Sequence, residues 1–511
     1  MAQSLKIIQN AIVITCEDPN RVLRADLFIR DERIAEISNR GEILKSIYPS
    51  AEVIDASGKI VLPGFVDAHY HGESFLLKHF TQLAPSSHWT KDGTIRRVLS
   101  FIRSEATKED LAIAYRAAYF SALKSGVTTI AEFGFDGLEA PYVAAAESMR
   151  RADLRGFVAL HNGDQIERAL TTSFSNIRLA VVLPAEDDLT TYNLNSTLRV
   201  AREHKWPVVV HYGETKRSDE VIRKNFSKSV MEVLAEYKVF DYPSQLVHLS
   251  VLDQRDAKLM AQSGRSLVLT PASVLSNATD SPPLALLLEH NVALALGSDW
   301  GSADPFANLR ALRSVAMSQQ VRELDAATLL NIHTRGSARA LGLDIDIGTV
   351  RPGKKADLVF VDASDVRLSA LLHANDSDRL LEEFVLHASS RDVSDVMING
   401  EFFVRQGQIM TYAEEDLKRE YSTLLMKLNA MTPARKNLAA TDDPSSIQSH
   451  LKEQHPSRLE SFDHVEEGFR IVRRNASPAE NAKKIIPMTP SEPQNVELSK
   501  SVKRVFGDED S

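Results

Sequence analysis

The chain has 511 residues, of which 43% are hydrophobic and 25% are charged, so it can bury a large core and is expected to hold more than one domain. Its formal net charge of −9 and the lack of a basic stripe argue against a nucleic-acid partner. Cys16 is the single cysteine, which excludes intrachain disulfides and a thiolate metal cluster and favours a reducing, cytoplasmic setting.

The first sixty residues carry short apolar runs separated by polar turns. The stretch "MAQSLKIIQNAIVIT" lacks the basic segment and long apolar run of a secretion signal, and no later run reaches membrane-spanning length. We therefore expect no membrane association. Residues 5–15, 25–37 and 52–64 place apolar residues near every second position, which predicts strands of a small β layer.

From about residue 63 the chain alternates buried-strand patterns with helix-like segments. Eight apolar runs qualify as strands, and the segments between most of them have the apolar spacing of helices. This number and alternation predict an α/β fold of the TIM-like (β/α)8 barrel type. The runs cover residues 64–71, 126–134, 156–163, 179–187, 207–214, 245–251, 266–273 and 292–301.

After the barrel the sequence returns to β patterns, in residues 347–363 and 393–410. The simplest packing joins the two flanks into one composite β-sandwich. The predicted domains are therefore a sandwich from residues 1–62 and 346–412, a barrel over 63–345, and a C-terminal extension over 413–511. In that extension we expect an amphipathic helix over 414–431, a second helix near 458–474, and otherwise extended or partly disordered chain.

Histidines and acids follow the apolar runs at the ends where a barrel presents its functional side chains. His69 and His71 stand two apart at the end of the first run, a spacing that by itself fits two solvent-facing polar residues as well as a metal site. The fifth run adds His211, and the eighth adds Asp299. Three imidazoles and a carboxylate suit a divalent cation such as zinc, or iron. His248 in the sixth run and Glu214 at the end of the fifth stand beside this set.

These motifs resemble those of the amidohydrolase superfamily, in the branch of cytosine-deaminase-like and triazine (ATZ/TRZ-type) aminohydrolases. The resemblance covers roughly residues 5 to 410 and rests on "PGFVDAHYHG", "GVTTIAEFG", "HYGET", "VHLS", "ALGSDWG" and "GTVRPGKKADLVFVD". Two departures concern the substrate pocket. The family often has Arg-Gly where this chain has Lys78-His79, and Cys-Pro-x-Ser-Asn where it reads "TPASVLSN".

The resemblance implies a role for each site residue. Binuclear members bridge two metals with a carboxylated lysine after strand four, and "LAVVLPAEDDL" has no lysine, so one metal held by His69, His71, His211 and Asp299 is expected. Metal binding lowers the pKa of water from ~15.7 toward ~7, which gives hydroxide at neutral pH. His248 would stabilise charge, Asp299 would take the proton of the water, and Glu214 would carry a proton to a ring nitrogen.

Three further residues are candidates for substrate contact, and two of them also have a simpler structural explanation. His161 ends the third run and equally fits an exposed or supporting residue. Trp300 follows Asp299, where packing is the simpler role, and His79 lies in the loop after the first strand.

The sequence supports three functions. The first is a metal-dependent hydrolase that deaminates an amino-substituted nitrogen heterocycle, such as a purine, pyrimidine, pterin or triazine-like ring. The second keeps the metal centre but opens a cyclic amide, as imidazolonepropionase-like relatives do, or cleaves another C–N or C–X bond. The third is an inactive barrel that serves as a binding or scaffold protein. The family resemblance also implies a homodimer or larger assembly.

Overall fold

The computed structural model describes residues 4–81, 91–135, 141–161, 163–170 and 177–432. These residues belong to the first of two units into which the chain divides, Met1–Ala434 and Arg435–Ser511. The predictions of a helix near 458–474 and of extended chain over 432–511 concern residues that lie, apart from Thr432, outside the described part.

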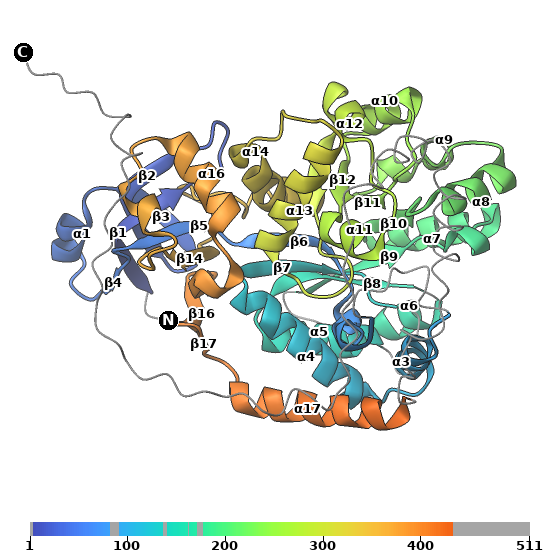
Figure 1. The fold of residues 1–511 in the computed structure, drawn as a ribbon, viewed down its shortest axis with the longest axis horizontal. Helices are drawn as coiled ribbons and strands as arrows, with labels where there is room; N and C mark the ends of the chain where they lie inside the picture. Colours follow the sequence, from blue (N-terminus) through green and yellow to red (C-terminus); the bar gives the residue numbers. More distant parts are fainter. Residues whose placement is uncertain (1–3, 82–90, 136–140, 162, 171–176, 433–511) are drawn as a thin grey trace, which may run out of the picture. The chain divides into compact units, whose positions relative to one another are not determined.

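A parallel sheet of eight strands forms the centre of the fold (Figure 1). The strands follow one another in chain order across the sheet, and a bridge between Tyr70 and Asp299 brings its two edge strands together, so the sheet is a nearly closed barrel. All eight predicted strands are confirmed: β6 (Phe65–Tyr70), β7 (Val127–Glu132), β8 (Arg155–Leu160), β9 (Ile177–Val182), β10 (Val208–Tyr212), β11 (Ser244–His248), β12 (Ser266–Leu269) and β13 (Ala293–Leu296).

The barrel strands are largely buried on both faces, which explains why apolar residues predominate in them. In β10, Val208 and Val210 belong to one buried cluster and Val209 to another, as expected when successive side chains point to opposite faces.

Helices alternate with the barrel strands, and their ends are set by local sequence. Thr107 and Asp110 form a reciprocal capping box at the start of α4, which fixes where that helix begins. The barrel-region helices are α2 (Lys78–Thr81), α3 (Gly93–Ser104), α4 (Lys108–Lys124), α5 (Pro141–Arg151), α6 (Gly163–Leu170), α7 (Thr191–His204), α8 (Lys216–Phe226), α9 (Val230–Glu236), α10 (Gln254–Ser263), α11 (Pro271–Asn277), α12 (Leu284–Glu289), α13 (Pro305–Ser318), α14 (Ala326–Asn331) and α15 (Ser337–Ala340).

The two flanks of the barrel meet in a second, nine-stranded sheet. The N-terminal β5 pairs antiparallel with the C-terminal β14, with Val361 opposite Ile60, so the predicted joining of the flanks is confirmed. The domain bounds predicted from the sequence stay a prediction. The strands are β1 (Leu5–Ile14), β2 (Val22–Arg30), β3 (Arg33–Ser38), β4 (Glu52–Asp55), β5 (Lys59–Pro63), β14 (Leu358–Asp362), β15 (Val393–Ile398), β16 (Glu401–Arg405) and β17 (Gln408–Ile409), with helices α1 (Gly41–Ile47) and α16 (Ser377–His387).

The sheet and the barrel are tied together by a largely buried ion pair. Arg155, at the start of β8, lies 2.9 Å from the Asp357 carboxylate, which also accepts a hydrogen bond from the Asn399 backbone amide at 2.8 Å.

Replacing Asp357 by alanine leaves the Arg155 guanidinium without its charge partner, and we expect a loss of about 3 kcal/mol in the free energy of unfolding. Denaturant titration measures this, with Asp378→Ala on the exposed face of α16 as control; an unchanged midpoint for Asp357→Ala would contradict the prediction.

The predicted amphipathic helix over 414–431 is confirmed as α17 (Glu414–Met431). It lies along α4 at the lower edge of Figure 1, burying Leu417, Leu424 and Leu428. Ion pairs to α4 flank this apolar face, including Lys124 with Glu414 at 2.8 Å. Among the described residues, none of the helices has the length and apolar character needed to cross a membrane.

Candidate metal centre

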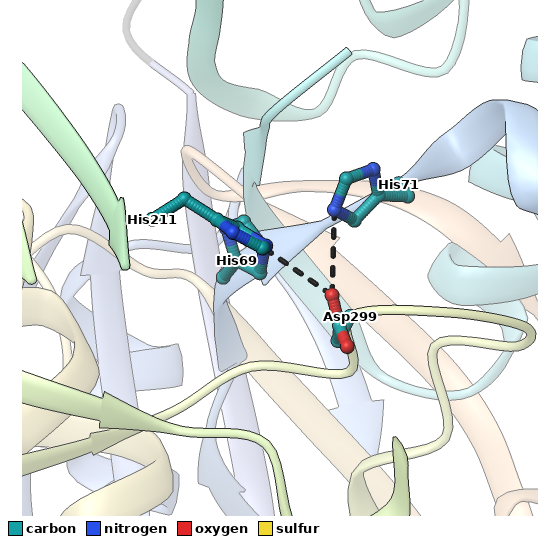
Figure 2. Close-up of side chains that lie close together, drawn as sticks. All are labelled: His69, His71, His211 and Asp299. Atoms are coloured by element: carbon teal, nitrogen blue, oxygen red, sulfur yellow. Dashed lines mark ion pairs between the residues drawn. The ribbon is translucent and has the colours of Figure 1, made fainter. Parts of the chain in front are cut away.

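Four side chains from three separate strand ends converge at one point (Figure 2). His69 lies in β6 and His71 directly after it, His211 lies in β10, and Asp299 follows β13. Each offers a ligand atom, and these atoms all lie within 4.8 Å of one another. In the described part of the chain, this is the one group of histidine, cysteine or acidic residues with such a geometry.

Three atoms of this group are buried without a hydrogen-bond partner. The Nε2 atoms of His69 and His71 each lie 3.3 Å from Oδ1 of Asp299, close enough for an ion pair but without a hydrogen bond. Buried polar atoms are normally paired, so three unpaired atoms that face one another call for a further partner. A divalent cation satisfies all three at once, because zinc accepts imidazole nitrogen and carboxylate oxygen together. The donor set therefore fits such a cation.

The backbone brings Asp299 between the two histidines of the first barrel strand. The Asp299 amide donates to the His69 carbonyl at 2.9 Å, and the His71 amide donates to the Asp299 carbonyl at 3.0 Å. A Cβ at Gly297 would lie 2.7 Å from the His69 carbonyl oxygen, so this close approach requires glycine. Asp299 itself has φ of 58°, a strained conformation for a residue with a side chain, of the kind that gathers at functional sites.

The second oxygen of Asp299 is held by the segment after β12. Ser273 in α11 donates its hydroxyl to Oδ2 of Asp299 at 2.6 Å and accepts a hydrogen bond from the side-chain nitrogen Nδ2 of Asn277 at 2.9 Å. Burial alone would raise the pKa of Asp299, but its contacts with His69 and His71 hold that pKa well below the usual range. The side chain is therefore an oriented carboxylate.

His248, at the end of β11, lies beside the group. Its Nε2 is 2.9 Å from Nε2 of His211, and its Nδ1 is 3.3 Å from the Thr270 hydroxyl. Burial lowers the pKa of His248 to about 4. Burial and the neighbouring His248 also hold the pKa of His211 well below its usual value. Both rings are therefore neutral near pH 7, and the neutral imidazole is the form that binds metal. With φ of 68°, His248 is a second residue with a side chain in the left-handed region.

Glu214 lies two residues after the end of β10. Burial, followed by repulsion from Asp299, raises the pKa of Glu214 to about 7. Glu186, after β9, accepts the Gly213 amide at 3.0 Å and so fixes the backbone just before Glu214. A carboxyl group with this pKa can give and take a proton near neutral pH.

Of the three candidates for substrate contact, Trp300 lies nearest the group. Its ring stacks on that of His71, with centroids 4.7 Å apart and an interplanar angle of 15°. His161 follows β8, and its Nε2 lies 2.8 Å from the Phe133 carbonyl. His79 lies in α2, and its ring centroid is 5.9 Å from that of Tyr421 in α17. Their contact with substrate stays a prediction.

Sequence reasoning missed two residues that shape this centre. The ring of Phe133, directly after β7, lies 4.8 to 5.1 Å from the rings of His69, His71 and His211 and forms an apolar wall against them. Phe133 could have been found from the sequence, because it lies at the end of a predicted barrel strand. Glu73 lies 3.2 Å from Nδ1 of His71. Its position two residues after a predicted ligand could have marked it.

Comparison with known proteins adds three findings. A model of the amidohydrolase family matches residues 60–403. A 5-methylthioadenosine/S-adenosylhomocysteine deaminase from Pelotomaculum thermopropionicum is 27% identical over 441 residues, covering 83% of this chain and 98% of that protein. Among solved structures, a zinc-bound adenosine deaminase from Xanthomonas campestris superposes with a TM-score of 0.72 at 22% identity, covering 83% of this chain and 98% of the other.

A zinc complex of the atrazine chlorohydrolase from Arthrobacter aurescens is also similar, with a TM-score of 0.69 and 20% identity, covering 82% of this chain and 99% of that one. At sequence identities of 22% and 20%, these two solved structures show that the fold is shared. The family match begins in β5 and ends in β16, so it takes in the whole barrel together with strands of both flanks.

Proposed function

The chain belongs to the amidohydrolase family, and on that premise we propose that it is a hydrolase that uses one divalent cation to remove the amino group from an amino-substituted nitrogen heterocycle. The observation that carries the proposal is the convergence of three unpaired buried atoms, on His69, His71 and Asp299. Zinc is the cation we favour, because it is named in the two solved structures described above.

The comparisons favour a purine nucleoside as the substrate class. The relative at 27% identity is named for deamination of 5-methylthioadenosine and S-adenosylhomocysteine, and a structural neighbour is an adenosine deaminase. Both names describe a 6-aminopurine attached to a ribose. A triazine ring, as in the atrazine hydrolase, is the second choice.

His69, His71, His211 and Asp299 would hold the cation. When bound, the cation would lower the pKa of a water molecule toward ~7 and so supply hydroxide at neutral pH. The His211 and His248 rings are neutral because they are buried, so each keeps a nitrogen lone pair.

The remaining steps are assigned to protein groups. Glu214 protonates a ring nitrogen of the substrate, which makes the neighbouring carbon more electrophilic. Asp299 takes the proton of the attacking water and returns it to the departing ammonia. His248 donates a hydrogen bond to the oxygen of the tetrahedral intermediate and stabilises its charge. Phe133 and Trp300 enclose the site with apolar surface, which strengthens these charge interactions.

An ammonia-release assay tests the proposal directly. The purified, zinc-loaded chain is offered adenosine, 5-methylthioadenosine, S-adenosylhomocysteine, guanine, cytosine, a pterin and an aminotriazine. We expect ammonia with at least one of these rings and the fastest release with an adenosine derivative. If none releases ammonia while a cyclic amide opens, as followed by its ultraviolet spectrum, the second function replaces the first.

Further proposals concern the setting of the enzyme. The single cysteine supports a cytoplasmic location, and the family resemblance supports a homodimer or larger assembly. Size-exclusion chromatography with light scattering tests the assembly. The scaffold alternative predicts that the purified chain contains no transition metal. The convergence of the His69, His71, His211 and Asp299 side chains weighs against it.

A further inference from the structure

The second ring nitrogen of His71 faces a buried carboxylate. His71 Nδ1 lies 3.2 Å from Oε1 of Glu73, and only 6% of the His71 side chain and 5% of the Glu73 side chain are exposed. The contact is therefore shielded from water. A neutral imidazole, the form that binds a metal, presents its lone pair at Nε2 when its Nδ1–H donates to a carboxylate, and Nε2 of His71 is the atom that faces Asp299 at 3.3 Å.

We propose that Glu73 is a positioning residue that fixes the tautomer and the orientation of His71 for metal binding. The inference rests on the proposed function to the extent that a cation must bind at this centre. It goes beyond the four ligands, because it gives a role to a residue outside the group that would hold the cation.

The turn after β6 is built to hold Glu73 in this place. The segment Gly72–Leu76 forms a 3-10 turn directly after His71, and the Ser74 hydroxyl and amide both donate to the His71 carbonyl, at 2.5 and 3.0 Å. The Gly72 amide donates to both oxygens of Glu132 at 3.1 Å. A Cβ at Gly72 would lie 2.7 Å from both Glu132 Oε2 and Tyr115 Cδ1, so a larger residue here would displace these two buried side chains.

The face of the His71 ring is also fixed. Trp300 stacks on this face, while Glu73 meets the edge of the ring at Nδ1. The ring is thus restrained against both tilting and flipping. Such restraint favours metal binding, because a preoriented ligand loses less side-chain entropy when the cation arrives.

Stability alone does not account for a carboxylate at this position. Glu73 is buried, and its second oxygen, Oε2, has no hydrogen-bond partner. Burying a carboxylate is costly, and an apolar side chain of similar volume is often neutral or stabilising in its place. If Glu73 served only the stability of the fold, its replacement by an apolar residue would lower the stability of the metal-free chain. The positioning role predicts instead that this replacement weakens metal binding.

The test uses the full chain with leucine, which is apolar and of similar volume, or glutamine, which keeps an acceptor oxygen but no charge, at position 73. After metal removal, the zinc dissociation constant is measured by competition with a chromophoric chelator, and the melting temperature of the metal-free chain is recorded. We expect weaker zinc binding by about 100-fold for Glu73→Leu and about tenfold for Glu73→Gln, with no fall in the melting temperature of Glu73→Leu. The exposed control Glu220→Gln, on α8, should match the wild type in both measurements.

Wild-type zinc affinity in either variant at position 73 would overturn the proposal, and so would a wild-type chain that binds no zinc. If Glu73→Leu fails to fold, the Glu73→Gln result decides alone. Failure of the proposed function looks different: the wild type and the variants would then keep the expected order of zinc affinities while no heterocycle releases ammonia.

Discussion

Replacing Asp299 by asparagine is expected to remove both the bound cation and the activity. The carboxylate is fully buried, faces two histidine nitrogens at 3.3 Å, and carries the only negative charge among the four converging side chains. Loss of a single charge-stabilising donor costs an enzyme about 10²–10³-fold in kcat. Loss of the cation is therefore expected to lower kcat/KM by at least about 10³-fold. Metal content by plasma mass spectrometry and the ammonia assay measure the two effects.

The matched control for this change is Asp378→Asn, in the first turn of α16, where the side chain is exposed. It should keep the metal content and activity of the wild type. Asp299→Asn with a full equivalent of zinc and undiminished activity would contradict the assignment of Asp299 to the metal centre.

Replacing Glu214 by glutamine is expected to separate activity from metal binding. Glu214 is not part of the converging group, so the zinc content should stay at the wild-type level. Its proposed task is proton transfer, which contributes typically about 10²–10⁴-fold, and glutamine cannot perform it. We therefore expect kcat to fall by about 10²–10⁴-fold, measured by ammonia release at saturating substrate.

The pH dependence of the wild type adds a second measurement at this residue. Burial and the charge of Asp299 raise the pKa of Glu214 to about 7, so the protonated form is lost as the pH rises through that value. The kcat/KM of the wild type should fall as the pH rises above about 7, since the protonated form of Glu214 is required.

The control for Glu214→Gln is Glu220→Gln, on the exposed face of α8, which should keep the wild-type rate. An equal loss of rate in Glu214→Gln and Glu220→Gln would argue against a special role for Glu214.

The architecture could be predicted from the sequence because the barrel strands are buried on both faces. Runs such as "PVVVHYGE" are continuously apolar and end in polar residues, which marks both the strand and its mouth-facing end. The same reasoning places His69, His71, His211, Glu214, His248 and Asp299 at one end of the barrel, and the family resemblance implies which four of them would hold a cation. The joining of the flanks, through β5 and β14, followed from their shared β pattern.

Contacts between distant segments could not be predicted in this way. The left-handed conformation of Asp299 and its two backbone bonds to His69 and His71 depend on how the barrel closes. The docking of α17 is a similar case: the Tyr421 hydroxyl donates to the Phe75 carbonyl at 3.0 Å, in the turn that also carries Glu73. An amphipathic pattern predicts that a helix buries one face, but it does not identify the surface that receives it.

The central proposal, that His69, His71, His211 and Asp299 hold one divalent cation, is open to direct measurement. The most direct is a crystal structure of the zinc-loaded chain, with anomalous diffraction recorded at the zinc absorption edge. We expect one strong anomalous peak within bonding distance of all four side chains, about 2.0–2.2 Å from their nitrogen and oxygen atoms. A zinc-loaded crystal with no peak at this position, or with its peak among other residues, would contradict the assignment.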